Sequence, residues 1–130
     1  PADPRALDAL AAADQVVLAP GSLYTSVLPV LCVPQIAAAV RETSGVVVQV
    51  ANLGPQEPET SELNLADHLR AVLDHGGRVD RFLFEANGYY ARNDETIAEL
   101  GAIPVAADVA RPHGRAHDPV RLGEALERAV

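Results

Sequence analysis

The sequence has little or nothing of several residue types that mark common classes of protein. Its 130 residues contain no Lys, Met or Trp, and Cys32 is the single cysteine. One thiol cannot form an internal disulfide, and no multi-cysteine zinc motif is present. Because Cys32 lies in an apolar segment that is predicted to be helical, we expect a buried thiol.

Basic charge is also scarce. All ten basic residues are Arg, and the formal net charge is -8. This balance argues against a broad surface for nucleic acid or for an anionic membrane, so neither is expected as a partner. A small anionic ligand is compatible with the net charge, because backbone N–H groups can hold an anion.

Neither a signal peptide nor an apolar run long enough to span a membrane is visible, which favours a cytoplasmic location. Aromatic residues make up only 4% of the chain, although 48% of it is hydrophobic. The core must therefore be built from Val, Leu, Ile and Ala. This composition suits a buried parallel sheet covered by Ala-rich helices. The length fits a single domain, residues 1–130.

Apolar, β-branched runs alternate with helical segments along the chain. The predicted strands are Gln15–Ala19, Val46–Val50, Arg81–Ala86 and Ile103–Val109. The predicted helices are Pro4–Ala13, Thr25–Glu42, Leu65–His75, Asp94–Leu100 and Val120–Ala129. Pro34 is expected to kink or divide the second helix. The alternation predicts an α/β fold with three α/β/α layers and a mostly parallel, Rossmann-like sheet of about four strands.

Ligands of such sheets bind beyond the C-terminal ends of the strands. Three loops at that edge are rich in polar residues and glycine: 20–26, 52–64 and 87–93. In the first loop, Gly21 permits a tight turn and a helix begins, with its free N–H groups and partial positive charge. The hydroxyls of Ser22 and Thr25 have two interpretations at this stage: they hold a phosphate, or they cap the helix.

Three motifs resemble one family. The stretch ADQVVLAPGSLYTSVLP, residues 13–29, resembles "ADxxxxGPGSLYTSxxP", a signature of the gluconeogenesis-factor (YvcK-like) family within the CofD-like superfamily. Residues 52–60 and the later pair Asp67-His68 resemble the family's "NxxTQPGETxGxxxxDH". The run from His117 resembles "HDPxxLxxAL". The second motif departs from the family at Pro55, at Glu57-Pro58, which replaces Pro-Gly, and at Ser61, which replaces Asp.

The resemblance implies that this chain is the C-terminal portion of a larger CofD-like domain, with an incomplete sheet. It implies a regulatory protein that binds a nucleotide sugar of the UDP-sugar type and affects central carbon metabolism, cell-wall precursor supply and cell shape. The ligand-binding residues it implies are Gly21, Ser22, Leu23, Tyr24, Thr25, Ser26, Asn52, Gln56, Thr60, Asp67 and His68. The alternative is a 2-phospho-L-lactate transferase that acts on a deazaflavin coenzyme precursor with a nucleotide donor and magnesium.

Several of these residues keep a second interpretation. Asn52 contacts the ligand or shapes its turn, and Asp67 contacts the ligand or complements the helix dipole. His68 is expected to hydrogen-bond a phosphate or base rather than to act as a general base, because no partner orients it. No catalytic residue and no dedicated metal site is predicted, and His113 and His117 are expected to face solvent or to pack.

A third interpretation is a truncated piece without activity of its own. The sheet edge left open by truncation would aggregate or pair with another chain, and a homo-oligomer is one such pairing.

Overall fold

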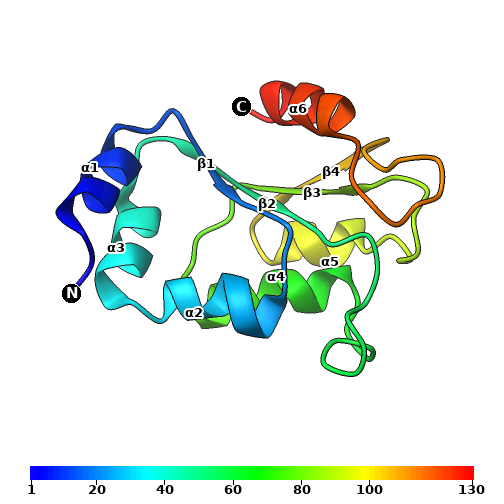
Figure 1. Ribbon diagram of the computed structural model, residues 1–130, viewed down its shortest axis with the longest axis horizontal. Coiled ribbons are helices and arrows are strands. Elements are labelled where there is room, and N and C mark those ends of the chain that lie inside the picture. The colour runs from blue at the N-terminus through cyan, green and yellow to red at the C-terminus, as the bar shows by residue number, and fades with distance from the viewer.

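The computed structural model describes residues 1–130 as a four-stranded, fully parallel sheet (Figure 1). The strands are β1 (Gln15–Leu18), β2 (Val46–Val50), β3 (Arg81–Glu85) and β4 (Ile103–Ala107), and they lie side by side in chain order. All three pairings are parallel, as the alternating pattern predicted. The predicted α/β fold with helices on both faces is therefore confirmed.

Helices cover the two faces of the sheet unequally (Figure 1). One face is covered by α1 (Pro4–Ala12), α2 (Leu28–Leu31), α3 (Pro34–Glu42), α4 (Leu65–Asp74) and α5 (Asp94–Glu99). The other face is covered by α6 (Pro119–Arg128) alone. Because successive residues of a strand point to opposite faces, Phe82 and Phe84 pack among the helices of the first face. Leu83 packs instead in the cluster that contains Ala125 of α6.

The segment predicted as one helix from Thr25 to Glu42 is divided into three pieces. A π-helical turn, η1 (Leu23–Val27), precedes α2, and α3 begins at Pro34. The axis bends by 78° between Leu23–Leu31 and Pro34–Glu42. Proline lacks the N–H that a continuing helix requires, so Pro34 is tolerated only in the first turn of a new helix. The prediction of a kink or division at Pro34 is confirmed, and regular α-helix begins only at Leu28, with Pro29 in its first turn, after the π-helical turn.

The break also changes the environment of the cysteine. Cys32 lies between α2 and α3 and is exposed, so the expected buried thiol is wrong. No single helix has the length and apolar composition needed to cross a membrane; only the bent pair of helices on either side of Cys32 would qualify, by length and composition alone.

An arginine holds together the N-terminal ends of the central strands. The Arg78 guanidinium donates to the carbonyl oxygens of Arg41 and Thr43, both at 2.9 Å, and of Gly45 at 2.7 Å. It also pairs with Asp80 at 2.8 Å, and the Asp80 carboxylate accepts the N–H of Val47 at 2.8 Å. This network closes one end of the sheet, so the loops at the opposite end form the open side of the molecule.

Candidate functional site

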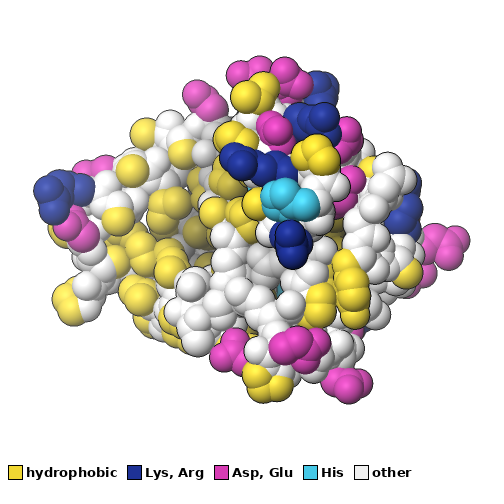
Figure 2. All heavy atoms as spheres, turned by 45° about the vertical axis from the view of Figure 1, so that its right-hand side comes forward, with side chains coloured by type: hydrophobic (Ala, Val, Ile, Leu, Met, Phe, Trp, Pro, Cys, Tyr) yellow, Lys and Arg dark blue, Asp and Glu magenta, His cyan; other side chains and the backbone are white.

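A cleft of about 570 Å³ lies at the C-terminal edge of the sheet. The loops that follow all four strands contribute to it. Its lining comprises Pro20 and Gly21 after β1, residues 52–56 after β2, Tyr89 after β3, and Gly114, Arg115 and His117 after β4. Figure 2 shows Arg and His side chains beside one another on the face where these loops lie, with acidic side chains around them. The cleft therefore occupies the position at which open parallel sheets bind ligands.

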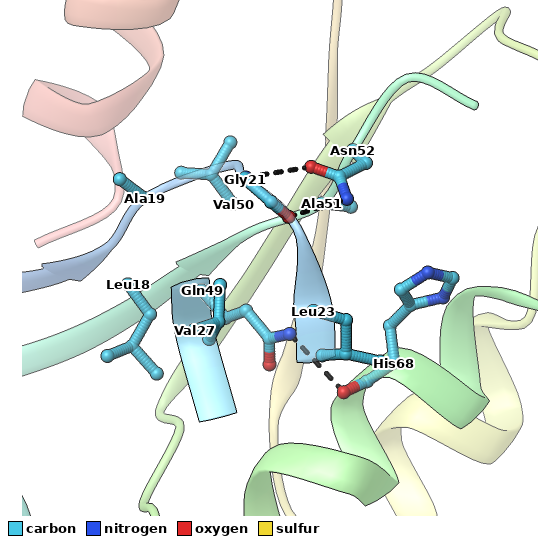
Figure 3. A pocket seen from close by; sticks show the side chains of 10 residues that line it. All are labelled: Leu18, Ala19, Gly21, Leu23, Val27, Gln49, Val50, Ala51, Asn52 and His68. Atoms are coloured by element: carbon cyan, nitrogen blue, oxygen red, sulfur yellow. Dashed lines mark hydrogen bonds between the residues drawn. The ribbon is translucent and has the colours of Figure 1, made fainter. Parts of the chain in front are cut away.

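Reciprocal hydrogen bonds join the first two loops (Figure 3). The Gly21 N–H donates to Oδ1 of Asn52 at 3.0 Å, and Nδ2 of Asn52 donates to the Gly21 carbonyl oxygen at 2.9 Å. Both ends of the Asn52 amide are thus bonded within the protein. Asn52 shapes the turn, and it fixes the wall of the cleft.

The turn does not depend on glycine for its backbone conformation. Gly21 is not among the positive-φ glycines, and a Cβ built on it would lie 3.7 Å from Cβ of Ser26, an ordinary contact distance. The missing side chain therefore leaves the backbone accessible to a ligand in the cleft and relieves no strain.

Most of the first predicted motif points away from the cleft. Ser22 Oγ accepts the N–H of Thr25 at 3.2 Å, so Ser22 caps η1. Leu23 is buried in the main core, and the Tyr24 ring is 46% exposed. Thr25 and Ser26 are exposed, and Ser26 lines a different groove beside β1. Of the six consecutive residues from Gly21 to Ser26, only Gly21 lines the cleft.

The second predicted motif lines the cleft with residues 52–56, and Thr60 supports them from outside the cleft. Gln56 lines the cleft. Thr60 is 1% exposed, and its Oγ1 accepts the N–H of Gln56 at 2.8 Å while its own N–H donates to the Gln56 carbonyl at 3.0 Å. Thr60 therefore holds the loop that presents Gln56.

Asp67 belongs to the start of α4. Its N–H donates to Oδ1 of Asn64 at 2.8 Å, and its carboxylate accepts the Asn64 N–H at 3.0 Å, which together form a capping box. The carboxylate also pairs with Arg70 at 3.0 Å. These contacts match the helix-terminal interpretation of Asp67, and Asp67 does not line the cleft.

His68 is buried beneath the cleft, not inside it. Its side chain is 3% exposed, and Nδ1 lies 2.7 Å from the Asn64 carbonyl oxygen. Because a carbonyl can only accept, Nδ1 donates, and Nε2 is left as an acceptor without a partner. Oε1 of Gln49 is likewise unpartnered, and both residues line a small cavity of about 10 Å³ next to Gly21 and Asn52 (Figure 3).

The two other buried polar atoms without a hydrogen-bond partner also lie at this end of the sheet. They are Tyr90 OH, whose ring lies 5.5 Å from that of His68, and Nε2 of His117. Buried polar groups without partners are rare in folded proteins and mark places where water or a ligand completes the hydrogen bonding. Their concentration at one edge supports a binding site there.

The fourth loop supplies cleft residues that the implied ligand set did not include, although His117 begins the third motif and was expected to face solvent or to pack. Burial lowers the pKa of His117, although a backbone hydrogen bond to Ala51 and the charge of Glu85 act in the opposite direction. His117 is therefore neutral near pH 7. Arg115 lies in the same cleft wall, and none of the ion pairs in the chain includes it. The loop's place at the same sheet edge was the signal available in the sequence.

Glu85 connects the third loop to the fourth. Its Oε2 accepts the N–H groups of Val109 and Ala110, both at 2.8 Å, and its Oε1 accepts that of Asn87 at 3.1 Å. Burial would raise the pKa of Glu85, but these three donors and Arg121 hold it below its usual value. Glu85 also lines a neighbouring hollow of about 360 Å³, which shares Tyr89 with the cleft.

The sequence of this chain matches a known protein family and several named proteins. The family model described as "2-phospho-L-lactate transferase CofD" matches residues 1–121. A "Putative gluconeogenesis factor" of Deinococcus radiodurans is 35% identical over 138 residues, which cover 94% of this chain and 29% of that protein. One of the same name from Mycobacterium tuberculosis is 38% identical over 134 residues, 98% of this chain and 39% of that protein.

A solved structure has the same fold. The crystal structure of a member of the UPF0052 family from Bacillus halodurans matches with a TM-score of 0.89 and 29% identity over 95% of this chain and 46% of that chain. This chain therefore spans less than half the length of the proteins that it matches. The similarities confirm the resemblance that the three motifs predicted.

Proposed function

Because this chain belongs to the 2-phospho-L-lactate transferase CofD family, we propose that its four-loop cleft binds the phosphate groups of a nucleotide sugar. The observation that carries the proposal is Arg115, a cation without an ion-pair partner that lines the cleft beside the neutral imidazole of His117. Guanidinium groups bind phosphate oxygens through paired, charge-assisted hydrogen bonds. The accessible backbone at Gly21 forms the facing wall.

The rest of the nucleotide sugar has suitable neighbours. Tyr89 is 71% exposed at the boundary between the cleft and the adjoining hollow, so its ring offers a face on which a base can stack. The hollow itself is lined by Asn87 and Asp108, whose side-chain oxygen atoms suit the hydroxyl groups of a sugar. These features support a ligand that extends across both hollows.

We place binding ahead of catalysis in this proposal. The cleft and the adjoining hollow contain no nucleophile paired with a base, since Nε2 of His117 has no partner and the Glu85 carboxylate is engaged by backbone N–H groups. The relatives are named gluconeogenesis factors, which favours a regulatory protein that senses a UDP-sugar. On this proposal, the full-length protein would respond to that ligand in central carbon metabolism, cell-wall precursor supply and cell shape.

The second candidate is the phosphoryl-type transfer stated in the description of the family model. Such transfer depends mainly on positioning and electrostatics, so the lack of a general base is compatible with it. The chain has no group of three or more His, Cys, Asp or Glu residues that could hold a metal ion. Mg²⁺ is commonly held by one or two carboxylates together with substrate phosphates, so this candidate does not require such a group. Formation of a 2-phospholactyl product from a deazaflavin precursor would favour this candidate.

Calorimetric titration with a panel of UDP-sugars, and with UDP alone, tests the proposal. We expect saturable heat, and we expect Arg115→Gln to weaken affinity about tenfold or more, which corresponds to about 1.4 kcal/mol. Arg128→Gln is the matched control, because Arg128 is exposed in the last turn of α6 and lines neither hollow. Absence of heat from every UDP-sugar in a folded sample, or equal losses in the two variants, would contradict the proposal.

A further inference from the structure

The loop after β4 carries two arginines, and each of them lines a different hollow. Arg115 lines the cleft, and Arg111 lines the adjoining hollow of about 360 Å³. Gly114, which lies between them in the chain, lines both. One short loop therefore presents a cation to each of two adjoining hollows.

Backbone hydrogen bonds close this loop into a compact turn. The Arg111 N–H donates to the Ala116 carbonyl oxygen, and the Gly114 N–H donates to the Arg111 carbonyl oxygen, both at 2.8 Å. Beside these bonds, Ala110 and His117 form an antiparallel bridge. Gly114 has a φ of 72°, a conformation that glycine adopts without steric cost. The backbone that carries the two arginines is thus held at the edge of the sheet.

The acidic side chains of the adjoining hollow already have partners. Both carboxylate oxygens of Asp108 accept from the Arg121 guanidinium at 2.9 Å. The Glu85 carboxylate accepts three backbone N–H groups at 2.8–3.1 Å. Neither acid is therefore free to neutralise a further cation in this hollow.

Arg111 is the charged group of the hollow that has no partner. Its side chain is exposed and takes part in none of the ion pairs of the chain. Asp118 lies within range of its charge, but that carboxylate caps α6 by accepting the N–H groups of Val120 and Arg121. A guanidinium offers a planar pair of donors that matches a carboxylate. The hollow is thus equipped for an anionic group.

The position of Arg111 indicates which part of the ligand carries that group. Under the proposed function, the phosphates lie beside Arg115 in the cleft, and the sugar lies in the hollow with Asn87. A neutral hexose would leave Arg111 unmatched. A uronic acid, in which a carboxylate replaces the hydroxymethyl group of the hexose, would pair with it.

We propose that Arg111 binds the carboxylate of a sugar acid, so that the protein prefers a nucleoside diphosphate linked to a uronic acid over one linked to a neutral hexose. This inference rests on the proposed function and names the class of sugar. It assigns separate tasks to the two arginines of one loop: Arg115 contacts the phosphates, and Arg111 selects the sugar.

Calorimetric titration of the protein with UDP-glucuronate and with UDP-glucose tests the inference. The two ligands differ only at the exocyclic carbon of the sugar, which is a carboxylate in the first and a hydroxymethyl group in the second. Because the formal net charge of the protein is -8, the more anionic ligand should bind less tightly unless a local cation compensates. We expect UDP-glucuronate to bind about fivefold more tightly, the upper range for an exposed ion pair.

Three matched variants make the test specific. Arg111→Gln should abolish the preference for UDP-glucuronate. Arg115→Gln should weaken the binding of both ligands by a similar factor and keep the preference, because Arg115 lines the cleft and not the hollow. Arg128→Gln should alter neither affinity, since Arg128 lines neither hollow.

The outcomes separate this inference from the proposed function. If the wild-type protein binds both ligands but does not prefer UDP-glucuronate, the inference is overturned and the proposed function stands. The same holds if the preference survives Arg111→Gln or is lost in Arg115→Gln. If a folded sample binds neither ligand nor any other UDP-sugar, the proposed function fails and the inference fails with it.

Discussion

Replacing Glu85 with Gln should destabilise the protein by about 2–4 kcal/mol. The Glu85 carboxylate accepts three backbone N–H groups, from Asn87, Val109 and Ala110, at 2.8–3.1 Å. Hydrogen bonds to a charged group contribute roughly 1.5–3 kcal/mol each. An amide keeps one oxygen, which can still serve two of the donors without the charge. Its NH₂ group then meets the third donor, so one full bond is lost and two are weakened.

Urea unfolding of both proteins at pH 7 measures the effect as a lower midpoint with an unchanged slope. Glu127→Gln is the control: Glu127 is exposed on α6, so its loss should stay within about 0.5 kcal/mol. The pKa of Glu85 is lower in the folded state than in the unfolded state. The ionised carboxylate therefore stabilises the protein fully above the unfolded-state pKa, near 4.5, and this stabilisation is lost as the pH falls through the folded-state pKa. The Gln variant should lose less stability on acidification. A destabilisation no larger than that of the control would refute this account of Glu85.

Two further predictions concern the opposite end of the sheet and the cleft. Arg78→Lys should lower the free energy of unfolding by about 2 kcal/mol. A lysine ammonium cannot donate to all three carbonyl oxygens and the carboxylate that the guanidinium contacts. A thermal or urea midpoint equal to that of the wild type would contradict this. The pKa of His117 is lowered by burial, so the unfolded state binds the proton more readily. The neutral form of His117 contributes fully to the stability of the protein above the unfolded-state pKa of about 6.5. Stability should decline as the pH falls from there through the folded-state pKa of His117. His117→Gln should remove that part of the decline, and identical pH profiles for the two proteins would count against a buried neutral imidazole.

The strands could be predicted because their signal is local. The run Val46–Val50 is continuous, apolar and β-branched, and the structure places β2 at those residues. The path from Thr25 to Glu42 could be predicted only in part. Pro34 signals the break within the sequence itself, but the π-helical turn at Leu23–Val27 and the exposure of Cys32 depend on how the pieces pack.

The candidate site was less accessible to prediction because its contacts join distant segments. The Asn52 amide spans 31 residues to reach Gly21, so the sequence alone could not distinguish a turn-shaping role from a ligand contact. Asp67 and Asn64 form a local pair, so the helix-terminal interpretation of Asp67 could be offered from the sequence. His117 begins the third motif, but it reaches the cleft only because β4 lies in the same sheet as β1, so the motif alone did not place it there.

The central claim is that the loops after all four strands together hold a nucleotide sugar. Amide chemical-shift mapping during titration with UDP-sugars tests it most directly. The account predicts saturable shifts that cluster at Gly21, at residues 52–56, at Tyr89, and at Gly114, Arg115 and His117, all of which line the cleft. Saturable shifts confined to the groove beside β1 or to the surface of α6, or no shifts with any UDP-sugar, would contradict it.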